Sequence, residues 1–332
     1  MNKKIIAAAI AASFVAAPAI AEPTVYGKLR QSVDFVDMGT TDEVQIRDKS
    51  SRLGIKGSED LGNGLKAIYK MEFNVKASET GSNGTGHVNG STAITANRNQ
   101  YVGLAGDFGT VLVGRHDAPN NMAWSKNNVF GDTVADLKGS NGPLEWERID
   151  GTVAYVSPSF SGLTFAAAIV PDETTYNPTG GDGLADHYSV AAMYSNGGLY
   201  AALGHLALDV TGADVDETVL AVNYAMDAFK VGVTYEMAET GTINDVDTLQ
   251  LFGTYTMGNN VLKAQWWDMD ADAVNGDADG WAIGLDHNFS KRTQAQLTYV
   301  DVDADSAAVR DAYKGSTLKD GDIFSIGLNH NF

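Results

Sequence analysis

From residue 22 onward, the chain consists of runs about ten residues long in which apolar and polar side chains alternate. In the segment 322–332, apolar residues occupy the even positions from Phe324 to Leu328, and small polar residues occupy the odd positions between them. Alternation with a period of two places the apolar and polar side chains on opposite faces of an extended strand. The pattern therefore predicts an all-β chain in which each strand has one apolar and one polar face.

Sixteen such runs follow one another along the chain, and the turn clusters between them are of two kinds. The runs lie at 24–36, 49–57, 65–76, 97–105, 110–115, 149–157, 163–170, 187–195, 199–208, 217–226, 229–238, 246–257, 261–270, 279–288, 293–302 and 322–332. Seven connections are tight, at 58–64, 106–109, 157–162, 195–198, 227–228, 258–260 and 289–292. Eight are longer, polar and acidic, at 37–48, 77–96, 116–148, 171–186, 209–216, 239–245, 271–278 and 303–321.

Strict alternation of seven short and eight long connections predicts sixteen antiparallel strands with both chain termini on the same side of the barrel. No apolar run beyond residue 21 is long enough for a membrane helix, which needs roughly 20 residues. The other structure that satisfies every backbone group in lipid is a closed barrel. We therefore expect a 16-stranded antiparallel transmembrane barrel, apolar outside and polar inside, with short periplasmic turns and long extracellular loops. A soluble sandwich gives no reason for the sorting of loops by length.

Aromatic residues near the strand ends agree with this expectation. Tyr and Trp collect where a membrane meets water, although each ring here can also be an ordinary packed aromatic. The residues concerned are Tyr26, Tyr155, Trp266, Trp267, Trp281 and Tyr299.

The first residues resemble an export signal. Lys3 and Lys4 precede the apolar run 5–17, and the small residues of 18–21 follow it. We expect cleavage after Ala21, so that 22–332 forms the barrel. A buried N-terminal helix is the alternative.

Composition narrows the class of partner. The chain has no Cys, so the barrel must be stabilised without disulfides. It carries 23 basic and 42 acidic residues, and loss of Lys3 and Lys4 leaves 21 against 42, a net charge near −21. Such a charge argues against nucleic acid as a partner, because phosphates require basic protein surfaces.

Two acid-rich segments are candidate calcium sites. The first has Asp268, Asp270, Asp272, Asp277 and Asp279, and the second has Asp301, Asp303 and Asp305. Ala273 stands where a calcium loop needs glycine, so the motif fails. We expect no cofactor, and we expect these acidic loops to be solvated or to hold Ca²⁺ only adventitiously, with a dedicated calcium site as the alternative.

The longest connection, 116–148, is the best candidate for narrowing a wide lumen. Loops of this length without secondary structure are commonly functional, although a surface loop is the plain alternative. Apolar anchors such as Trp124, Phe130 and Trp146 would attach it to the inner wall. Its carboxylates would then face the opening, and they are Asp132, Asp136, Glu145 and Glu147.

Basic side chains are expected on the wall opposite this loop. Lys28, Arg30, Arg52, Lys56 and Lys70 lie on the polar faces of their strands. A charge at mid-depth in lipid costs about 2–4 kcal/mol, so these side chains belong in the lumen. A solvated strand end is the plain alternative for any single one of them.

Alternation is less regular around Arg98 than around Arg148. In the run 97–105, turning Arg98 and Gln100 inward also turns Val102 and Leu104 inward. In the run 149–157, outward Val153 and Tyr155 place Thr152, Asp150 and Arg148 on the inner side.

Five segments, in order along the chain, resemble the neisserial and betaproteobacterial general porins. They are SRLGIKGSEDLGNGLKAIYKMEF at 51–73, RNQYVGL at 98–104 with GTVLVGR at 109–115, YVSPSFSGL at 155–163, and GLNHNF at 327–332. The matches occur in the same order and are spread over nearly the whole chain after residue 21.

The resemblance implies an outer-membrane homotrimer of sixteen-stranded barrels, each narrowed by its third loop. It implies that Arg52, Arg98 and Arg148 are constriction arginines, with Glu72 as an acidic partner. It also implies that Phe332 is an assembly signal, read by the barrel assembly machinery. The surroundings would be outer-membrane lipid and lipopolysaccharide, and small hydrophilic solutes and ions would pass by passive diffusion.

Two other functions stay open from sequence. One is a channel that prefers particular solutes, such as anions, phosphate or sugars. The other is a barrel enzyme, which would need converging catalytic side chains. No nucleophile motif is present, and the histidines are scattered, at His87, His116, His187, His205, His287 and His330. We therefore do not expect an enzyme.

Overall fold

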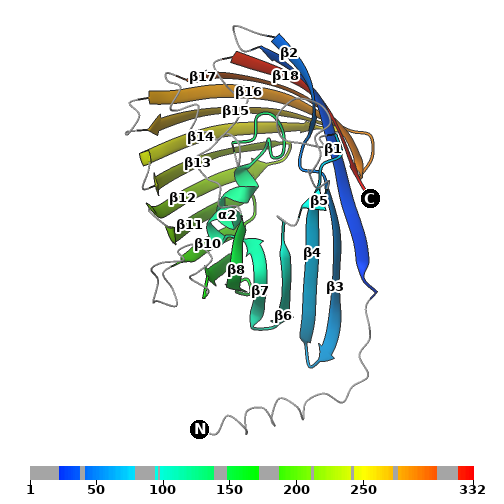
Figure 1. The fold of residues 1–332 in the computed structure, drawn as a ribbon, viewed down its shortest axis with the longest axis vertical. Coiled ribbons are helices and arrows are strands. Elements are labelled where there is room, and N and C mark those ends of the chain that lie inside the picture. The colour runs from blue at the N-terminus through cyan, green and yellow to red at the C-terminus, as the bar shows by residue number, and fades with distance from the viewer. Residues whose placement is uncertain are drawn as a thin grey trace.

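The structure, a computed structural model, describes residues 22–37, 42–78, 94–95, 98–137, 148–171, 187–210, 213–240, 243–271, 276–304 and 321–332. These residues form a closed antiparallel β-barrel with a short helix inside it (Figure 1). The expected signal, residues 1–21, lies outside the described residues. None of the helices in the described ranges is long and apolar enough to cross a membrane.

The barrel is a single antiparallel sheet. The strands are β1 (Thr24–Asp37), β2 (Asp42–Asp48), β3 (Arg52–Gly62), β4 (Leu65–Val75), β5 (Ile94–Thr95), β6 (Gln100–Gly106), β7 (Gly109–Asp117), β8 (Arg148–Val156), β9 (Leu163–Ile169), β10 (Tyr188–Asn196), β11 (Leu199–Val210), β12 (Ala213–Met226), β13 (Phe229–Thr240), β14 (Ile243–Met257), β15 (Asn260–Ala271), β16 (Gly276–Asn288), β17 (Thr293–Ala304) and β18 (Gly321–Asn331). Because β2 and β3 both pair with β1, and β5 and β6 both pair with β4, the described elements make the predicted sixteen strands.

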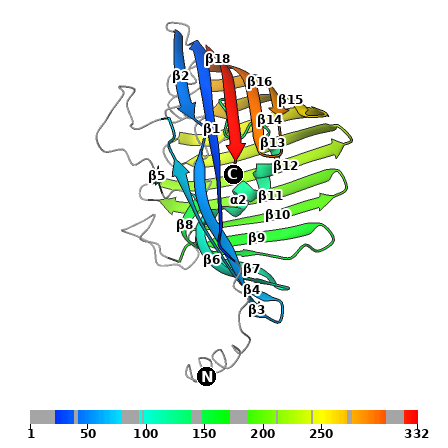
Figure 2. The ribbon, with the colours of Figure 1, turned by 90° about the vertical axis from the view of Figure 1, so that its right-hand side faces the viewer.

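The barrel closes where the last strand pairs with the first, and Figure 2 shows β18 beside β1. Two backbone hydrogen bonds of 3.0 Å join Gly27 and Phe332. The Phe332 ring fills the space that a side chain at position 27 would need. The last residue is therefore part of the seam that closes the barrel.

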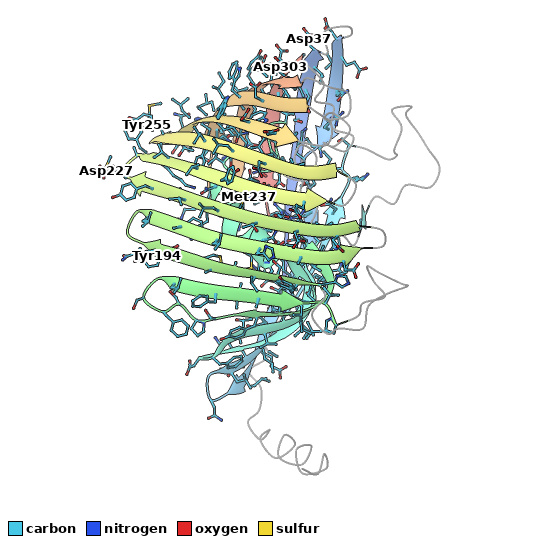
Figure 3. The ribbon with its side chains drawn as sticks, turned by 90° about the vertical axis from the view of Figure 1, so that its left-hand side faces the viewer. Asp37, Tyr194, Asp227, Met237, Tyr255 and Asp303 are labelled. Carbon is cyan, nitrogen blue, oxygen red and sulfur yellow. The ribbon has the colours of Figure 1, made fainter. Side chains whose placement is uncertain are left out.

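The apolar faces of the strands point outward, as predicted. On β18, Ile326 and Leu328 are 44% and 55% exposed, whereas Ser325 before them and Asn329 after them are buried. The same inversion runs through β13, where Val231 is exposed and Thr234 is buried. A soluble barrel would bury the apolar set, so this surface suits lipid. In Figure 3, Tyr194, Asp227 and Tyr255 lie along the edge of the tight turns.

Four predicted loops are shorter than predicted, because the strands continue into them. The predicted loop bounds were wrong at 37–48, 209–216, 239–245 and 271–278. In the first of these, strand β2 covers 42–48. In the other three, one strand ends at 210, 240 or 271, and the next strand begins at 213, 243 or 276, respectively. The alternation of buried and exposed side chains continues in the loop predicted at 209–216. Leu208 and Val215 point inward and are buried, whereas Asp214, next to Val215, is exposed. Exposed acids made these strand ends look like loops.

Candidate pore constriction

The chain enters the barrel interior directly after β7. Pro119 begins the helix α2 (Pro119–Trp124), where its fixed φ suits the first turn, and the 3-10 helix η1 (Ser125–Asn127) follows. We call the described segment 118–137 the inner loop. Figure 1 shows α2 within the ring of strands, in contact with β9, β10, β11 and β12. The first described part of the predicted constriction loop 116–148 therefore lies against the inner wall.

Helix α2 is held by a buried polar contact and an apolar one. The Asn120 backbone N–H donates to Ser189 Oγ at 3.0 Å, and Asn120 Nδ2 donates to Glu217 Oε1 at 2.6 Å. All three residues are buried. Beside them, Ala123 and Trp124 pack against a cluster of the inner wall, whose members include Tyr200, Ala202, Val219 and Ala221.

A second attachment follows at η1. Asn127 is fully buried, and its Nδ2 donates to Val233 O at 2.8 Å and to Thr234 Oγ1 at 2.9 Å. Its Oδ1 accepts from Asn223 Nδ2 at 2.7 Å. One side-chain amide therefore joins the inner loop to both β12 and β13.

The third attachment is mainly apolar. Phe130, Val134 and Ala135 are buried in one cluster with Trp267, Ala282, Val300 and other wall residues. Gln265 Nε2 donates to Ala135 O at 2.6 Å, and the Lys263 ammonium lies 4.7 Å from the centre of the Phe130 ring. The inner loop thus crosses the lumen side of the wall from β10 to β17.

At its far end the inner loop meets the predicted basic wall. The Asp132 carboxylate lies 3.3 Å from Lys28 Nζ, 3.3 Å from Arg52 Nη2 and 3.6 Å from Arg30 Nη1. Arg30 Nη1 also donates to the backbone oxygens of Gly131 and Asp132, at 2.7 and 2.9 Å. Asp132 therefore does not face the basic wall across an opening, as was expected, but touches it.

The electrostatic state of Asp132 follows from its surroundings. Burial raises the pKa of this loop carboxyl, but Lys28, Arg30 and Arg52 outweigh it and hold the pKa below its usual range. Asp132 is therefore ionised at neutral pH. Asp136 accepts from the Asp132 backbone N–H at 2.5 Å and from Asn128 Nδ2 at 3.0 Å, so it stabilises the turn of the inner loop.

Glu72 organises a second group of charges next to the first. Its Oε1 accepts from Arg98 Nε at 2.6 Å, and its Oε2 lies 2.7 Å from Tyr26 Oη and 3.4 Å from Lys70 Nζ. Lys56 lies 5.1 Å from the centre of the Tyr26 ring.

We use the name basic cluster for Lys28, Arg30, Arg52, Lys70 and Arg98 together with Asp132 and Glu72. Five positive charges minus two negative charges leave a net charge of +3.

The remaining predicted residues lie elsewhere. Arg148 pairs with Asp117 at 3.0 Å and donates to Asn99 Oδ1 at 3.2 Å, so no described contact joins it to Asp132. Asp150 is exposed and pairs with Arg115 at 2.7 Å. Glu145 and Glu147 lie outside the described residues.

The irregular alternation near Arg98 is resolved by the start of β6. Strand β6 begins at Gln100, after Arg98, so the alternation of side chains along the strand does not determine which way Arg98 points. Arg98 reaches Glu72 inside the barrel, whereas Val102 and Leu104 are exposed on the outer face.

Several residues of this region were not singled out from sequence. Lys263 and Asp286 form a nearly buried ion pair of 3.0 Å beneath Phe130, on neighbouring strands. The alternation that identified Arg52 applies equally to them, because each shares a face with polar residues. Asn120 and Asn127 carried no signal, since their partners lie about 70 to 107 residues away in sequence and only the loop's path joins them.

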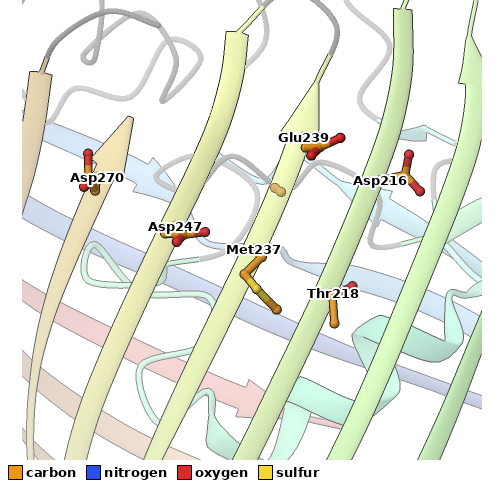
Figure 4. Close-up of a pocket in the computed structure, with 7 residues that line it drawn as sticks. Asp216, Thr218, Met237, Glu239, Asp247 and Asp270 are labelled. Carbon is orange, nitrogen blue, oxygen red and sulfur yellow. The ribbon is translucent and has the colours of Figure 1, made fainter. Parts of the chain in front are cut away.

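The outer face carries a separate acidic hollow of about 430 Å³, shown in Figure 4. Asp216, Glu239, Asp247 and Asp270 line it, with Thr218 and Met237 below. In the parts of the chain that the structure describes, no group of three or more His, Asp or Glu residues is arranged to hold a metal ion. Asp272 and Asp305, from the two candidate calcium segments, lie outside those parts.

Comparison with known proteins decides the family. Residues 7–307 match the family model described as Gram-negative porin. The chain belongs to this porin family. It is 28% identical to the major outer membrane protein P.IB of Neisseria meningitidis serogroup B, with all of both chains covered. It is thus an outer-membrane channel for passive diffusion.

Solved porin structures share the fold. The anion-selective porin from Comamonas acidovorans is 23% identical, with a TM-score of 0.78 and coverage of 94% of this chain and 99% of that one. The trimer form of OmpT, an outer membrane protein of Vibrio cholerae, is 19% identical, with a TM-score of 0.69 and coverage of 96% and 100%. Both confirm the sixteen-stranded porin barrel as the architecture of this chain.

Proposed function

We propose that the inner loop narrows the lumen to a constriction at the basic cluster, and that the pore passes small solutes generally with a preference for anions. The observation that carries the proposal is the contact of Asp132 with Lys28 and Arg52. Because Asp132 lies against the basic wall, its carboxylate neutralises part of the positive charge of the wall and does not set up a field across the opening. The net charge of +3 that remains attracts anions to the narrowest part.

The position of the inner loop can be tested with single cysteines, because the natural chain has none. Lys126 is exposed within the inner loop, and its Nζ donates to Ser195 Oγ at 2.9 Å. A bulky thiol reagent on Lys126→Cys should lower the unitary current through a planar bilayer. The matched control is Val231→Cys, which is exposed on the outer face of β13. Complete labelling of Lys126→Cys without a change in current would contradict the proposed constriction.

A channel that binds phosphate preferentially is the second candidate. The observation that favours it is the group of donors on one wall, where Lys28, Arg52 and Lys70 are each partly exposed. Block of the chloride current by millimolar phosphate, but not by a neutral sugar, would support this second function. No block by either solute favours the general pore.

We also propose that the chain is a homotrimer and that its passive transport requires neither a cofactor nor a catalytic group. Support for the trimer comes from the fold shared with OmpT, whose structure is described as a trimer form. The mass of the folded protein in detergent should equal three protomers. A folded protein of one protomer mass would contradict the trimer.

The other proposed partners follow from the chain ends and the outer face. We propose that residues 1–21 are removed as a signal, and that Phe332 is read by the barrel assembly machinery. In the membrane, the apolar outer face would lie among lipid and lipopolysaccharide. The mature protein should begin at Glu22, and deletion of Phe332 should reduce the amount of barrel in the outer membrane. A normal amount would contradict the signal role of Phe332.

A further inference from the structure

Two glycines of the inner wall lie where the inner loop touches it. A Cβ atom added to Gly204 on β11 would lie 2.6 Å from Asn120 Cα and 3.1 Å from Ala123 Cβ, both in α2. A Cβ added to Gly284 on β16 would lie 2.8 Å from Cε1 of Phe130. These positions are at the first and third attachments of the inner loop. The backbone of the wall is therefore in direct contact with the loop at both points.

Space, and not backbone conformation, explains why these residues are glycine. Neither Gly204 nor Gly284 is among the glycines of the described chain with positive φ, so an L-residue could adopt either conformation. Glycine inside a strand is destabilising relative to alanine and often marks the close approach of another backbone. Here the approaching segment is the inner loop.

We propose that Gly204 and Gly284 are seats that set how deeply the inner loop lies against the wall, and hence how wide the constriction is. The proposal about width rests on the proposed function of the inner loop. Ordinary van der Waals contact begins near 3.4 Å. An alanine at position 204 would therefore move α2 by about 0.8 Å, the difference between 3.4 and 2.6 Å. The movement is away from the wall and into the lumen.

The two seats differ in how easily a neighbour can yield. At Gly204 the closest atom belongs to the backbone of α2, so the helix itself must move. At Gly284 the closest atom is the edge of the Phe130 ring. Leucine at position 130 lacks that atom. Phe130→Leu should therefore remove the steric clash made by Gly284→Ala, but not the clash made by Gly204→Ala. This difference gives a test of the contact itself.

The experiment compares Gly204→Ala and Gly284→Ala with Gly327→Ala. Gly327 also lies on the inner face, but its added Cβ would meet nothing closer than Gln296 Cβ at 3.6 Å. Folding of each variant is checked by its circular dichroism and its resistance to detergent. Amide hydrogen exchange of the peptides 118–127 and 128–137 then reports loop docking, and unitary current in a planar bilayer reports pore width.

We expect Gly204→Ala to increase exchange in 118–127, and Gly284→Ala to increase exchange in 128–137 until Phe130→Leu is added. Both single variants should lower the unitary current and add noise, whereas Gly327→Ala should behave as wild type. Exchange at the wild-type level in folded Gly204→Ala and Gly284→Ala would contradict the proposal that these two glycines set how closely the inner loop packs against the wall. Increased exchange without a change in current would show that the two glycines contact the inner loop but do not control the width of the pore. That result would also contradict the proposed constriction.

Discussion

Neutralising Arg52 should weaken the anion preference of the pore. Arg52 Nη2 lies 3.3 Å from Asp132, and its side chain is 21% exposed, so it contributes to the potential that a passing ion meets. Arg52→Gln lowers the net charge of the basic cluster from +3 to +2. One unit charge acts on an ion 4 Å away with about 1 kcal/mol in water, which corresponds to roughly a fivefold change in relative permeability.

The assay is the reversal potential of single channels in a KCl gradient. The potential of Arg52→Gln should shift toward that of potassium, and the shift should be larger at low salt because counterions screen exposed charges beyond about 10 Å at 0.1 M. The control is Lys66→Gln, which removes an exposed positive charge at the far end of β4. An unchanged potential for Arg52→Gln, or an equal shift for Lys66→Gln, would refute the reasoning.

Three further predictions concern the carboxylates of the basic cluster. Asp132→Asn should shift the reversal potential toward that of chloride, opposite to Arg52→Gln; a shift toward potassium would contradict the net-charge argument. The pKa of Asp132 is held below its usual range, chiefly by Lys28 acting against burial, so selectivity should stay constant from pH 7 down to about 4. The ionised Asp132 carboxylate stabilises the attachment of the inner loop, and this stabilisation is lost only when the carboxylate is protonated. Hydrogen exchange of the inner loop should therefore increase only as the pH falls below about 4. Glu72→Gln leaves the buried Arg98 without its counter-charge and should lower stability by about 3 kcal/mol, measured by urea unfolding in detergent; an unchanged midpoint would contradict this role.

The strands could be predicted because lipid imposes a simple rule on every one of them. Outward side chains at lipid depth must be apolar, so a charge such as Arg52 or Lys28 within a strand has to point into the lumen. The same local rule covers Lys263 and Asp286. It fails beyond the lipid, where outward acids such as Asp214 are solvated, and strand ends there look like loops.

The contacts of the inner loop could not be predicted, because they depend on its path across the barrel. Its length and its position between Asp117 and Arg148 predicted an inward fold, but not which acid would reach the wall. Asp132 and Asp136 are alike in sequence context, yet one contacts the basic cluster and the other closes a turn. Gly204 and Gly284 look like weak points in strands until the approach of the loop is known.

The most direct test of the account is single-channel recording from the purified, folded chain in a planar bilayer with a KCl gradient. The account predicts ohmic current steps without gating, and a reversal potential on the chloride side of zero. Inserted protein that gives no steps would contradict the pore, and a reversal potential on the potassium side would contradict an anion-attracting constriction at the basic cluster.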